Sequence, residues 1–398
     1  MSRINRELHP LELVTVVAGL MSLTALAIDV MLPALPAMGA DLGVSTENDR
    51  QLVIVAFVLG MGSGQLVFGP LSDRFGRRRV LVISLLLYTL FAVACAVPGS
   101  FEQLVLFRAL QGVTAAGARV VALSLVRDLF EGASMARTMS WVMATFMAVP
   151  ILAPNLGWLI LQVSTWRAIF WALVVFGAVL LVWVGARLPE TLSPERRRSI
   201  HPRALMEAYL EVVKNPTSRA YTIATGLAFG ALFAFISSSE QIFRSFGHAE
   251  RFPLYFAGVA GSMAVASMVN ARLVGRLGMR RLSHGALTVF TGIQVVYCAL
   301  YLSGVHDFAV FYTALALSFF VFSLIGANFN AMALQPLGHV AGTASAALGF
   351  ASTTLSGSIG GFVARQYNGT PLPVALGFLC LGASSLAVVT LGTRAQSA

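Results

Sequence analysis

The sequence predicts an all-α membrane protein in which twelve transmembrane helices form two pseudo-symmetric six-helix bundles. Three observations predict this fold class. The chain of 398 residues is 57% hydrophobic and only 11% charged, with a mean hydropathy of +0.79, whereas soluble domains carry about 25% charged residues. Apolar segments of membrane-spanning length recur along the whole chain, and one basic motif is repeated about half a chain length later.

Twelve apolar segments are long enough to cross a bilayer, which takes about 20 helical residues. We expect these spans at 12–36, 50–70, 80–98, 101–125, 138–161, 166–187, 219–242, 252–273, 284–303, 307–333, 341–364 and 372–392. The longest polar interruption lies between the sixth and seventh spans. It divides the chain into an N-terminal bundle over 1–187, a cytoplasmic linker over 188–218 and a C-terminal bundle over 219–398.

Part of the linker has the pattern of an amphipathic helix. Apolar residues share one helical face there: Leu205, Ala208, Tyr209, Val212 and Val213. This face predicts a helix on the cytoplasmic membrane surface. A solvated linker with one or two helical turns is an equal alternative.

The net charge of +10 follows from membrane topology. If the N-terminus is cytoplasmic, most arginines and lysines fall in cytoplasmic connections, as the positive-inside rule requires. We therefore expect a bacterial inner (plasma) membrane protein with both termini in the cytoplasm and no nucleic-acid partner. The three cysteines and six histidines show no ligand spacing, and no catalytic motif or phosphate loop is found. The sequence thus predicts no enzyme, no metal and no cofactor.

The repeated motif indicates a duplicated unit. DRFGRRRV, Asp73 to Val80, returns as GRLGMRRL, Gly275 to Leu282, and both copies follow the second span of their half. The matched positions are Arg74 with Arg276, Gly76 with Gly278, Arg78 with Arg280, and Arg79 with Arg281. Two related six-helix units with a site between them are the usual plan of a transporter.

Asp29 and Arg108 are charged residues well inside predicted spans. At 1.5 Å per residue, Asp29 lies about 24 Å above the cytoplasmic start of span 1. That is roughly 6 Å below the outer boundary of a hydrocarbon core about 30 Å thick. Arg108 lies about 10 Å below the outer end of span 4. The two groups share a similar depth, and charged residues at such depth are rare and functional by default.

Six segments carry motifs that occur together in one family of transporters. They are AIDVMLPALP (Ala27 to Pro36), GPLSDRFGRRR (Gly69 to Arg79), LFRALQGVTAAGA (Leu106 to Ala118), VPILAPNLGWLI (Val149 to Ile160), WRAIFW (Trp166 to Trp171) and NFNAMALQPLGHVAGTASA (Asn328 to Ala346). In order and spacing the chain resembles the major facilitator superfamily, particularly its twelve-span drug:proton antiporters of the bicyclomycin-resistance and phenicol-exporter group. In the span 5 signature, Ala153 and Trp158 replace two of the family's usual glycines.

The resemblance implies a gate in the loop after span 2. Arg74 and Arg77 would clamp acids on neighbouring helices in the outward-facing state; the alternative is a simple turn whose charges only set topology. The expected gate residues are Gly69, Asp73, Arg74, Gly76, Arg77 and Arg78. Because Gly275 stands where the first copy has Asp73, we expect an asymmetric gate whose latch lies in the N-terminal half.

The resemblance also implies that spans 1 and 4 face each other, so that Arg108 could reach Asp29. We expect Asp29 to be a proton-coupling group in the outer half of a central cavity, where Arg108 or bound substrate competes with its proton. Two alternatives stay open. One is a static Asp29–Arg108 ion pair that pins two helices, and the other is a neutral Asp29 without a role.

Span 5 should be one of the helices on which rocking occurs. Its antiporter-motif residues are Pro150, Pro154 and Gly157. The prolines remove backbone hydrogen bonds and favour a bend. Ala153 leaves open whether the protein exchanges substrates or works as a uniporter.

Residues on the family's cavity-lining spans form the expected substrate wall: Met143, Phe146, Met147, Phe233 and Phe235. Such side chains repack around varied apolar drugs, although lipid-facing positions would look the same. Glu240 ends span 7, where a solvated rim carboxylate is the favoured interpretation and a second proton site or a contact for a cationic drug is the alternative. Asn328 could bond either substrate or a neighbouring helix.

The sequence therefore predicts a proton-coupled multidrug efflux transporter that exports small amphipathic antibiotics, phenicol- or bicyclomycin-like, by alternating access. Its partners would be the drug, protons and the lipid bilayer, with the proton gradient as the energy source, and we expect a monomer. The alternative is a carrier of the same fold for a specific metabolite such as a sugar or an amino acid. The spans contain few polar side chains, which favours an apolar substrate.

Overall fold

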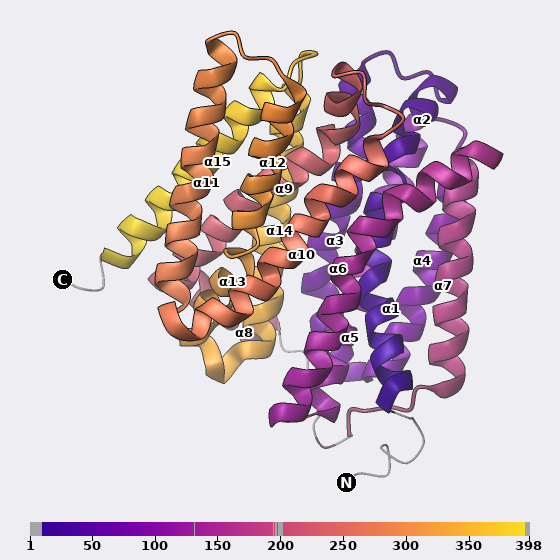
Figure 1. Ribbon diagram of the computed structural model, residues 1–398. Helices are drawn as coiled ribbons and strands as arrows, with labels where there is room; N and C mark the ends of the chain where they lie inside the picture. Colours follow the sequence, from indigo (N-terminus) through magenta and orange to yellow (C-terminus); the bar gives the residue numbers. More distant parts are fainter. Residues whose placement is uncertain (1–9, 131, 194, 196, 198–201, 395–398) are drawn as a thin grey trace. The chain divides into compact units, whose positions relative to one another are not determined.

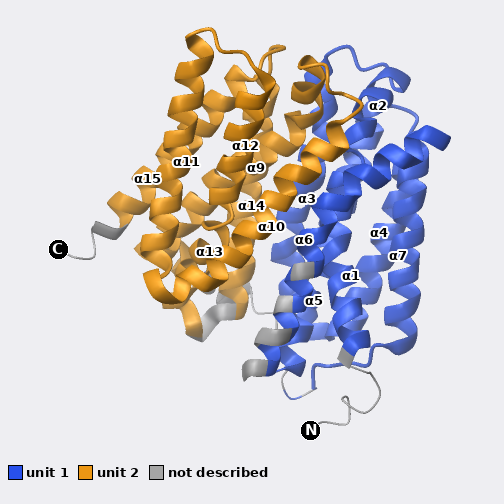
Figure 2. Ribbon diagram, viewed as in Figure 1, with its two compact units in different colours: residues 1–206 blue, residues 207–398 orange. Residues whose placement is uncertain are grey.

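The computed structural model describes residues 10–130, 132–193, 195, 197 and 202–394. Within these ranges the chain is helical and contains no β-strand. Twelve helical segments are long and apolar enough to cross a membrane, which confirms the predicted fold of twelve spans. The chain forms two compact units, unit 1 over residues 1–206 and unit 2 over residues 207–398 (Figure 2).

Unit 1 contains the first six spans (Figure 1). Its helices are α1 (Pro10–Asp29), α2 (Leu35–Asp41), α3 (Leu52–Phe75), α4 (Arg77–Ala96), α5 (Phe101–Leu129), α6 (Gly132–Val163) and α7 (Arg167–Arg187). α5 packs against α3, α4 and α1, and α1 also packs against α6. The fourth span is therefore the central helix of this bundle.

The first span is not the single helix expected at 12–36. α1 ends at Asp29, the 3₁₀ turn η2 (Leu32–Ala34) follows, and α2 resumes the span. Pro33 explains the break, because a proline has no N–H to donate to the carbonyl of Asp29 four residues earlier. Carbonyl groups at the end of α1 consequently lack helical partners.

α3 and α5 approach each other closely over two glycines. A Cβ at Gly60 would lie 2.0 Å from the carbonyl oxygen of Ala109, and one at Gly112 would lie 2.1 Å from that of Phe57. Small residues let helix backbones pack tightly inside membranes. This contact places Arg108 of α5 between α3 and the broken end of α1.

Two acidic residues join the first span to α7. Near the start of α1, Glu12 accepts hydrogen bonds from Trp183 Nε1 at 3.1 Å and from Arg187 Nε at 3.0 Å. At the end of α2, Asp41 accepts one from Arg167 Nη1, in the first turn of α7, at 2.5 Å. Both ends of the broken span are thus held by one helix, and the break lies between the tethers.

Unit 2 contains the last six spans. Its helices are α8 (Pro202–Lys214), which begins just before the unit boundary, α9 (Pro216–Ser245), α10 (Phe252–Leu277), α11 (Met279–Leu302), α12 (Phe308–Phe322), α13 (Gly326–Leu334), α14 (Ala341–Arg365) and α15 (Leu372–Arg394). α9 is the central helix and packs against α13, α14 and α15. The span expected as one helix at 307–333 is divided into α12 and α13.

Candidate functional site

Asp29 is the last residue of α1, and only 4% of its surface is exposed. Among the described residues, no group donates a hydrogen bond to its carboxyl group and no cation lies within ion-pair distance. The residue stands at the negative end of the α1 dipole. An ionised carboxylate is costly in such surroundings, and a protonated one is not.

Arg108 is 0% exposed and donates three hydrogen bonds. Its Nη2 donates to the carbonyl of Ala27 in the last turn of α1 at 3.0 Å, and its Nε to the carbonyl of Val53 on α3 at 3.1 Å. A cation is favourable at a helix C-terminus, so Arg108 caps the broken end of α1. The static Asp29–Arg108 ion pair considered from the sequence is not formed, because the guanidinium bonds to the backbone instead.

Sequence reasoning missed Gln111, which orients Arg108. Its Oε1 accepts the third hydrogen bond of the guanidinium, from Nη1 at 2.6 Å, and the residue is completely buried. The available signal was the spacing, because residues three apart lie on the same face of a helix. The Phe57 ring, 4.3 Å from the guanidinium carbon, adds a cation–π contact. Arg108 is therefore held in place without any help from Asp29.

The antiporter-motif helix packs against the same break. α6 continues through Pro150 and Pro154 as one helix. A Cβ at Gly157 would lie 1.8 Å from the carbonyl oxygen of Val30, so any side chain there would displace the broken turn. Ala153 is 1% exposed, which means that its methyl group is packed in the interior.

The loop between α3 and α4 forms a charged network around Arg77. The Arg77 guanidinium donates to Asp73 Oδ1 at 2.5 Å and to Asp128 Oδ2 at 3.0 Å. Its backbone N–H donates to Glu190 Oε1, in the segment after α7, at 2.8 Å. Gly76 has a φ of +99°, and a Cβ there would lie 2.2 Å from Glu190 Oε2. We call Asp73, Arg77, Asp128 and Glu190 the Arg77 network.

The other expected gate residues lie around this network. Arg78 is exposed and donates to the carbonyl of Gly185 on α7 at 2.5 Å. The Gly69 carbonyl accepts a hydrogen bond from the Ser72 hydroxyl at 2.9 Å. Arg74 is exposed, with its guanidinium carbon 5.2 Å from the Phe75 ring.

Asp128 and Glu190 of the Arg77 network were missed from the sequence. The sequence signal for Asp128 was its place at the end of the fourth span, and the signal for Glu190 was its place in LPET, just after the sixth span. Both are distant in sequence from Arg77, so only the fold brings these charges together.

Glu240 corrects an expectation from the sequence. The favoured interpretation was a solvated carboxylate at a rim, but the residue is 7% exposed and forms an ion pair with Arg244. The two residues are four apart on α9, so their side chains meet on one face. Asn328 is also bonded to a neighbouring helix, since its Nδ2 donates to Asn270 Oδ1 on α10 at 2.9 Å.

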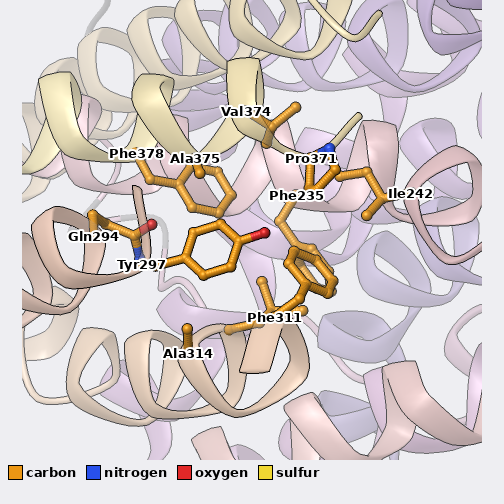
Figure 3. A pocket seen from close by; sticks show the side chains of 11 residues that line it. Phe235, Ile242, Gln294, Tyr297, Phe311, Ala314, Pro371, Val374, Ala375 and Phe378 are labelled. Carbon is orange, nitrogen blue, oxygen red and sulfur yellow. The ribbon is translucent and has the colours of Figure 1, made fainter. Parts of the chain in front are cut away.

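The expected cavity-wall residues are distributed unevenly. Phe235 is 2% exposed, stacks on Phe256 at 5.4 Å, and lines a cavity inside unit 2 together with Tyr297 and Phe378. This cavity is small: its free volume of about 10 Å³ is roughly what one water molecule needs (Figure 3). The others are more accessible: Met143 is 39% exposed, and Phe146, Met147 and Phe233 are half-buried.

Comparison with known proteins identifies the kind of molecule. The family model of the Major Facilitator Superfamily matches residues 17–361. A bicyclomycin resistance protein homolog of Haemophilus influenzae is 28% identical, with 94% of this chain and 95% of that one covered. A chloramphenicol resistance protein of Pseudomonas aeruginosa is also 28% identical, with 94% and 88% covered. The crystal structure of a D-xylose-proton symporter has the same fold, with a TM-score of 0.71 at 14% identity over 94% of this chain and 95% of that one.

Proposed function

The chain belongs to the Major Facilitator Superfamily, and we propose that it is a proton-coupled exporter of small amphipathic antibiotics of the phenicol or bicyclomycin kind. The names of the two antibiotic-resistance relatives support this substrate class. In this proposal the protein acts as a monomer in a bacterial inner membrane, with both termini in the cytoplasm.

The observation that carries the proposal is the isolation of the Asp29 carboxyl group. It is buried and has no partner among the described residues, while Arg108, a fully buried cation of the same bundle, bonds to the α1 backbone. Asp29 can therefore gain or lose a proton without breaking an ion pair. Within the described part of the chain, the other carboxyl group buried in a span is that of Glu240, and it already has Arg244 as its partner.

In the proposed cycle, Asp29 binds a proton from the outside and releases it to the inside when drug binds beside it. Arg108 stabilises the ionised form through its field and keeps the end of α1 in place. A driving force of about 150 mV is worth roughly 3.5 kcal/mol per proton. At about 1.4 kcal/mol per decade, one proton can sustain a few-hundred-fold gradient of a neutral drug.

The Arg77 network would serve as the latch of this cycle. Its ion pairs tie α3, α4 and α5 together, and Glu190 adds the segment after α7. A conformational change that separates these helices must break charged hydrogen bonds, which are the strong ones. We propose that the network stabilises one of the two access states.

Proton release on drug binding tests the proposal. Purified protein in detergent at weak buffering is mixed with chloramphenicol, and a dye follows the pH. The wild type should release up to one proton per bound drug molecule. Asp29→Asn should bind drug and release none, because the amide carries no exchangeable carboxyl proton, whereas the control Glu240→Gln should release protons like the wild type.

Three outcomes would contradict parts of this account. Proton release from Asp29→Asn would remove Asp29 as the coupling group. Loss of release in Glu240→Gln alone would transfer that role to the second bundle. If no phenicol or bicyclomycin binds to either protein, the substrate class is wrong and a metabolite carrier becomes the better proposal.

A further inference from the structure

The helix α8 exposes an apolar face that no part of the described chain covers. Met206 is 57% exposed, Leu210 is 44% exposed and Val213 is 58% exposed. At about 100° per residue these three side chains fall within roughly 60° of one another around the helix. Val212, about 160° from Leu210 by the same rule, is 5% exposed. α8 therefore packs on one side and presents an apolar stripe on another.

The connection to α9 keeps α8 close to the hydrocarbon boundary. α8 ends at Lys214 and α9 begins at Pro216, so Asn215 alone joins them. Asn215 is not a loose hinge, because its Oδ1 accepts a hydrogen bond from the backbone of Ser218 at 3.0 Å and caps α9. The apolar part of α9 starts after Arg219, about 8 Å from Lys214 along a helix. The apolar stripe is thus held within about one helix diameter of the bilayer.

The charges around the stripe suit an anionic surface. Lys214 and Arg219 are exposed on the two sides of the joint, and the sequence that precedes α8 holds Arg196, Arg197 and Arg198. Basic residues next to a membrane are attracted to anionic lipids. A helix that lies in the interface has this composition, with apolar residues on one face and basic residues beside it.

We propose that α8 is a membrane-surface helix, whose Met206, Leu210 and Val213 insert at the headgroup boundary of the leaflet on the side where α9 begins, with anionic phospholipid bound beside Lys214 and Arg219. This inference needs only that the chain spans a membrane and stands apart from the proposed substrate and proton coupling. It chooses between the two alternatives that the sequence left open for the linker. It also gives the linker a function: the helix fixes the start of α9 at one depth in the bilayer.

Site-directed spin labelling of the full chain measures this insertion. Cys95 and Cys298 are buried, so only the exposed Cys380 has to be replaced before a single cysteine is introduced. The positions are Leu210→Cys and Val213→Cys on the stripe, with Glu207→Cys as the control, because Glu207 is an exposed carboxylate about 120° around the helix from Val213. Each protein is placed, one per nanodisc, in phosphatidylcholine with and without phosphatidylglycerol.

The expected result is a reversal of accessibility between the two faces. Labels at 210 and 213 should collide several-fold more with oxygen than with a water-soluble nickel complex, and the label at 207 should show the opposite. Phosphatidylglycerol should increase the depth of the two stripe labels, and Lys214→Gln should remove that increase. An aqueous profile at all three positions would overturn the proposal, and so would labels that become buried only when two copies share one disc. If the stripe labels insert to the same depth with and without phosphatidylglycerol, the part of the proposal that names an anionic lipid is wrong.

Discussion

The two copies of the arginine-rich loop share a backbone and differ in their contacts. Gly76 between α3 and α4 has φ +99° and ψ 153°, and Gly278 between α10 and α11 has φ +77° and ψ 152°. In the first copy, Arg77 bonds to two acids of the Arg77 network. In the second copy, Arg276 and Arg281 are exposed and form no ion pair with any described residue.

The second copy lacks the residues that make the network. Met279 stands in the place of Arg77, and Gly275 in the place of Asp73. The acidic residues of unit 2 are Glu207, Glu211, Glu240, Glu250 and Asp307, and none of them stands at the position that Asp73 occupies in the first copy. Glu240, Glu250 and Asp307 lie near the ends of helices far from this loop, since α9 runs away from it and α10 returns. The comparison teaches that a glycine fixes the tight turn in both units, whereas the Arg77 network is a separate feature of unit 1.

The largest effect on stability is expected when Arg77 is replaced by methionine, the residue at the matched position 279. Arg77→Met leaves Asp73 and Asp128 without their partly buried cation, and loss of one partner of such a pair costs about 4 kcal/mol. Met279→Arg should leave stability nearly unchanged, because Gly275 stands where the first copy has Asp73. The free energy of unfolding in mixed detergent micelles measures both. Equal losses in the two variants would show that the loops are equivalent.

The next largest losses of stability are expected for substitutions of Gly76 and Gly278. Both have a backbone conformation that is essentially restricted to glycine and costs other residues about 1–3 kcal/mol. Gly278→Ala should therefore lose about 2 kcal/mol, since its Cβ would meet open space. Gly76→Ala should lose more, about 3 kcal/mol, because its Cβ would also displace Glu190. If the alanine at position 278 proves the more harmful, the asymmetry of the contacts is wrong.

Asp128→Asn should have a smaller effect. The amide oxygen can still accept from Arg77 at the same distance, and Asp73 continues to neutralise the cation. We expect a loss of about 1 kcal/mol, the difference between a charged and a neutral hydrogen bond. Combined with Arg77→Met, the change should add almost nothing, and full additivity in this double-mutant cycle would argue against a shared network.

The smallest effect is expected for Arg276→Ala. Its side chain is exposed, and surface substitutions away from special features usually change stability by less than about 0.5 kcal/mol. Arg74→Ala, the matched position in unit 1, should be similarly mild, since Arg74 is exposed as well. A large loss at position 276 would mean that the second loop has a structural role of its own.

The sequence predicted the features that depend on local composition. Twelve spans follow from apolar length, and the turn at Gly76 follows from a motif that contains its own glycine. The break after Asp29 was missed, because hydropathy does not distinguish a broken helix from a continuous one. Pro33 was the signal in the sequence that indicates the break. The burial of Glu240 was also missed, since its exposure depends on how neighbouring helices pack.

Contacts between distant residues were beyond reach of the sequence alone. Glu190 is far along the chain from Arg77, and nothing near either residue indicates the other. Helical rise predicted that Arg108 lies at about the depth of Asp29, but it could not predict that Arg108 donates a hydrogen bond to the carbonyl of Ala27. That contact needs the break in α1, which frees backbone groups for a side chain to satisfy.

The central claim is that the coupling proton of the transport cycle resides on Asp29 in unit 1. Proteoliposomes test it most directly, by comparison of drug exchange at equal pH with drug accumulation driven by a pH gradient. Asp29→Asn should exchange chloramphenicol between the two sides but accumulate none in response to the gradient, whereas the wild type should do both. Gradient-driven accumulation by Asp29→Asn at the wild-type level would contradict the account.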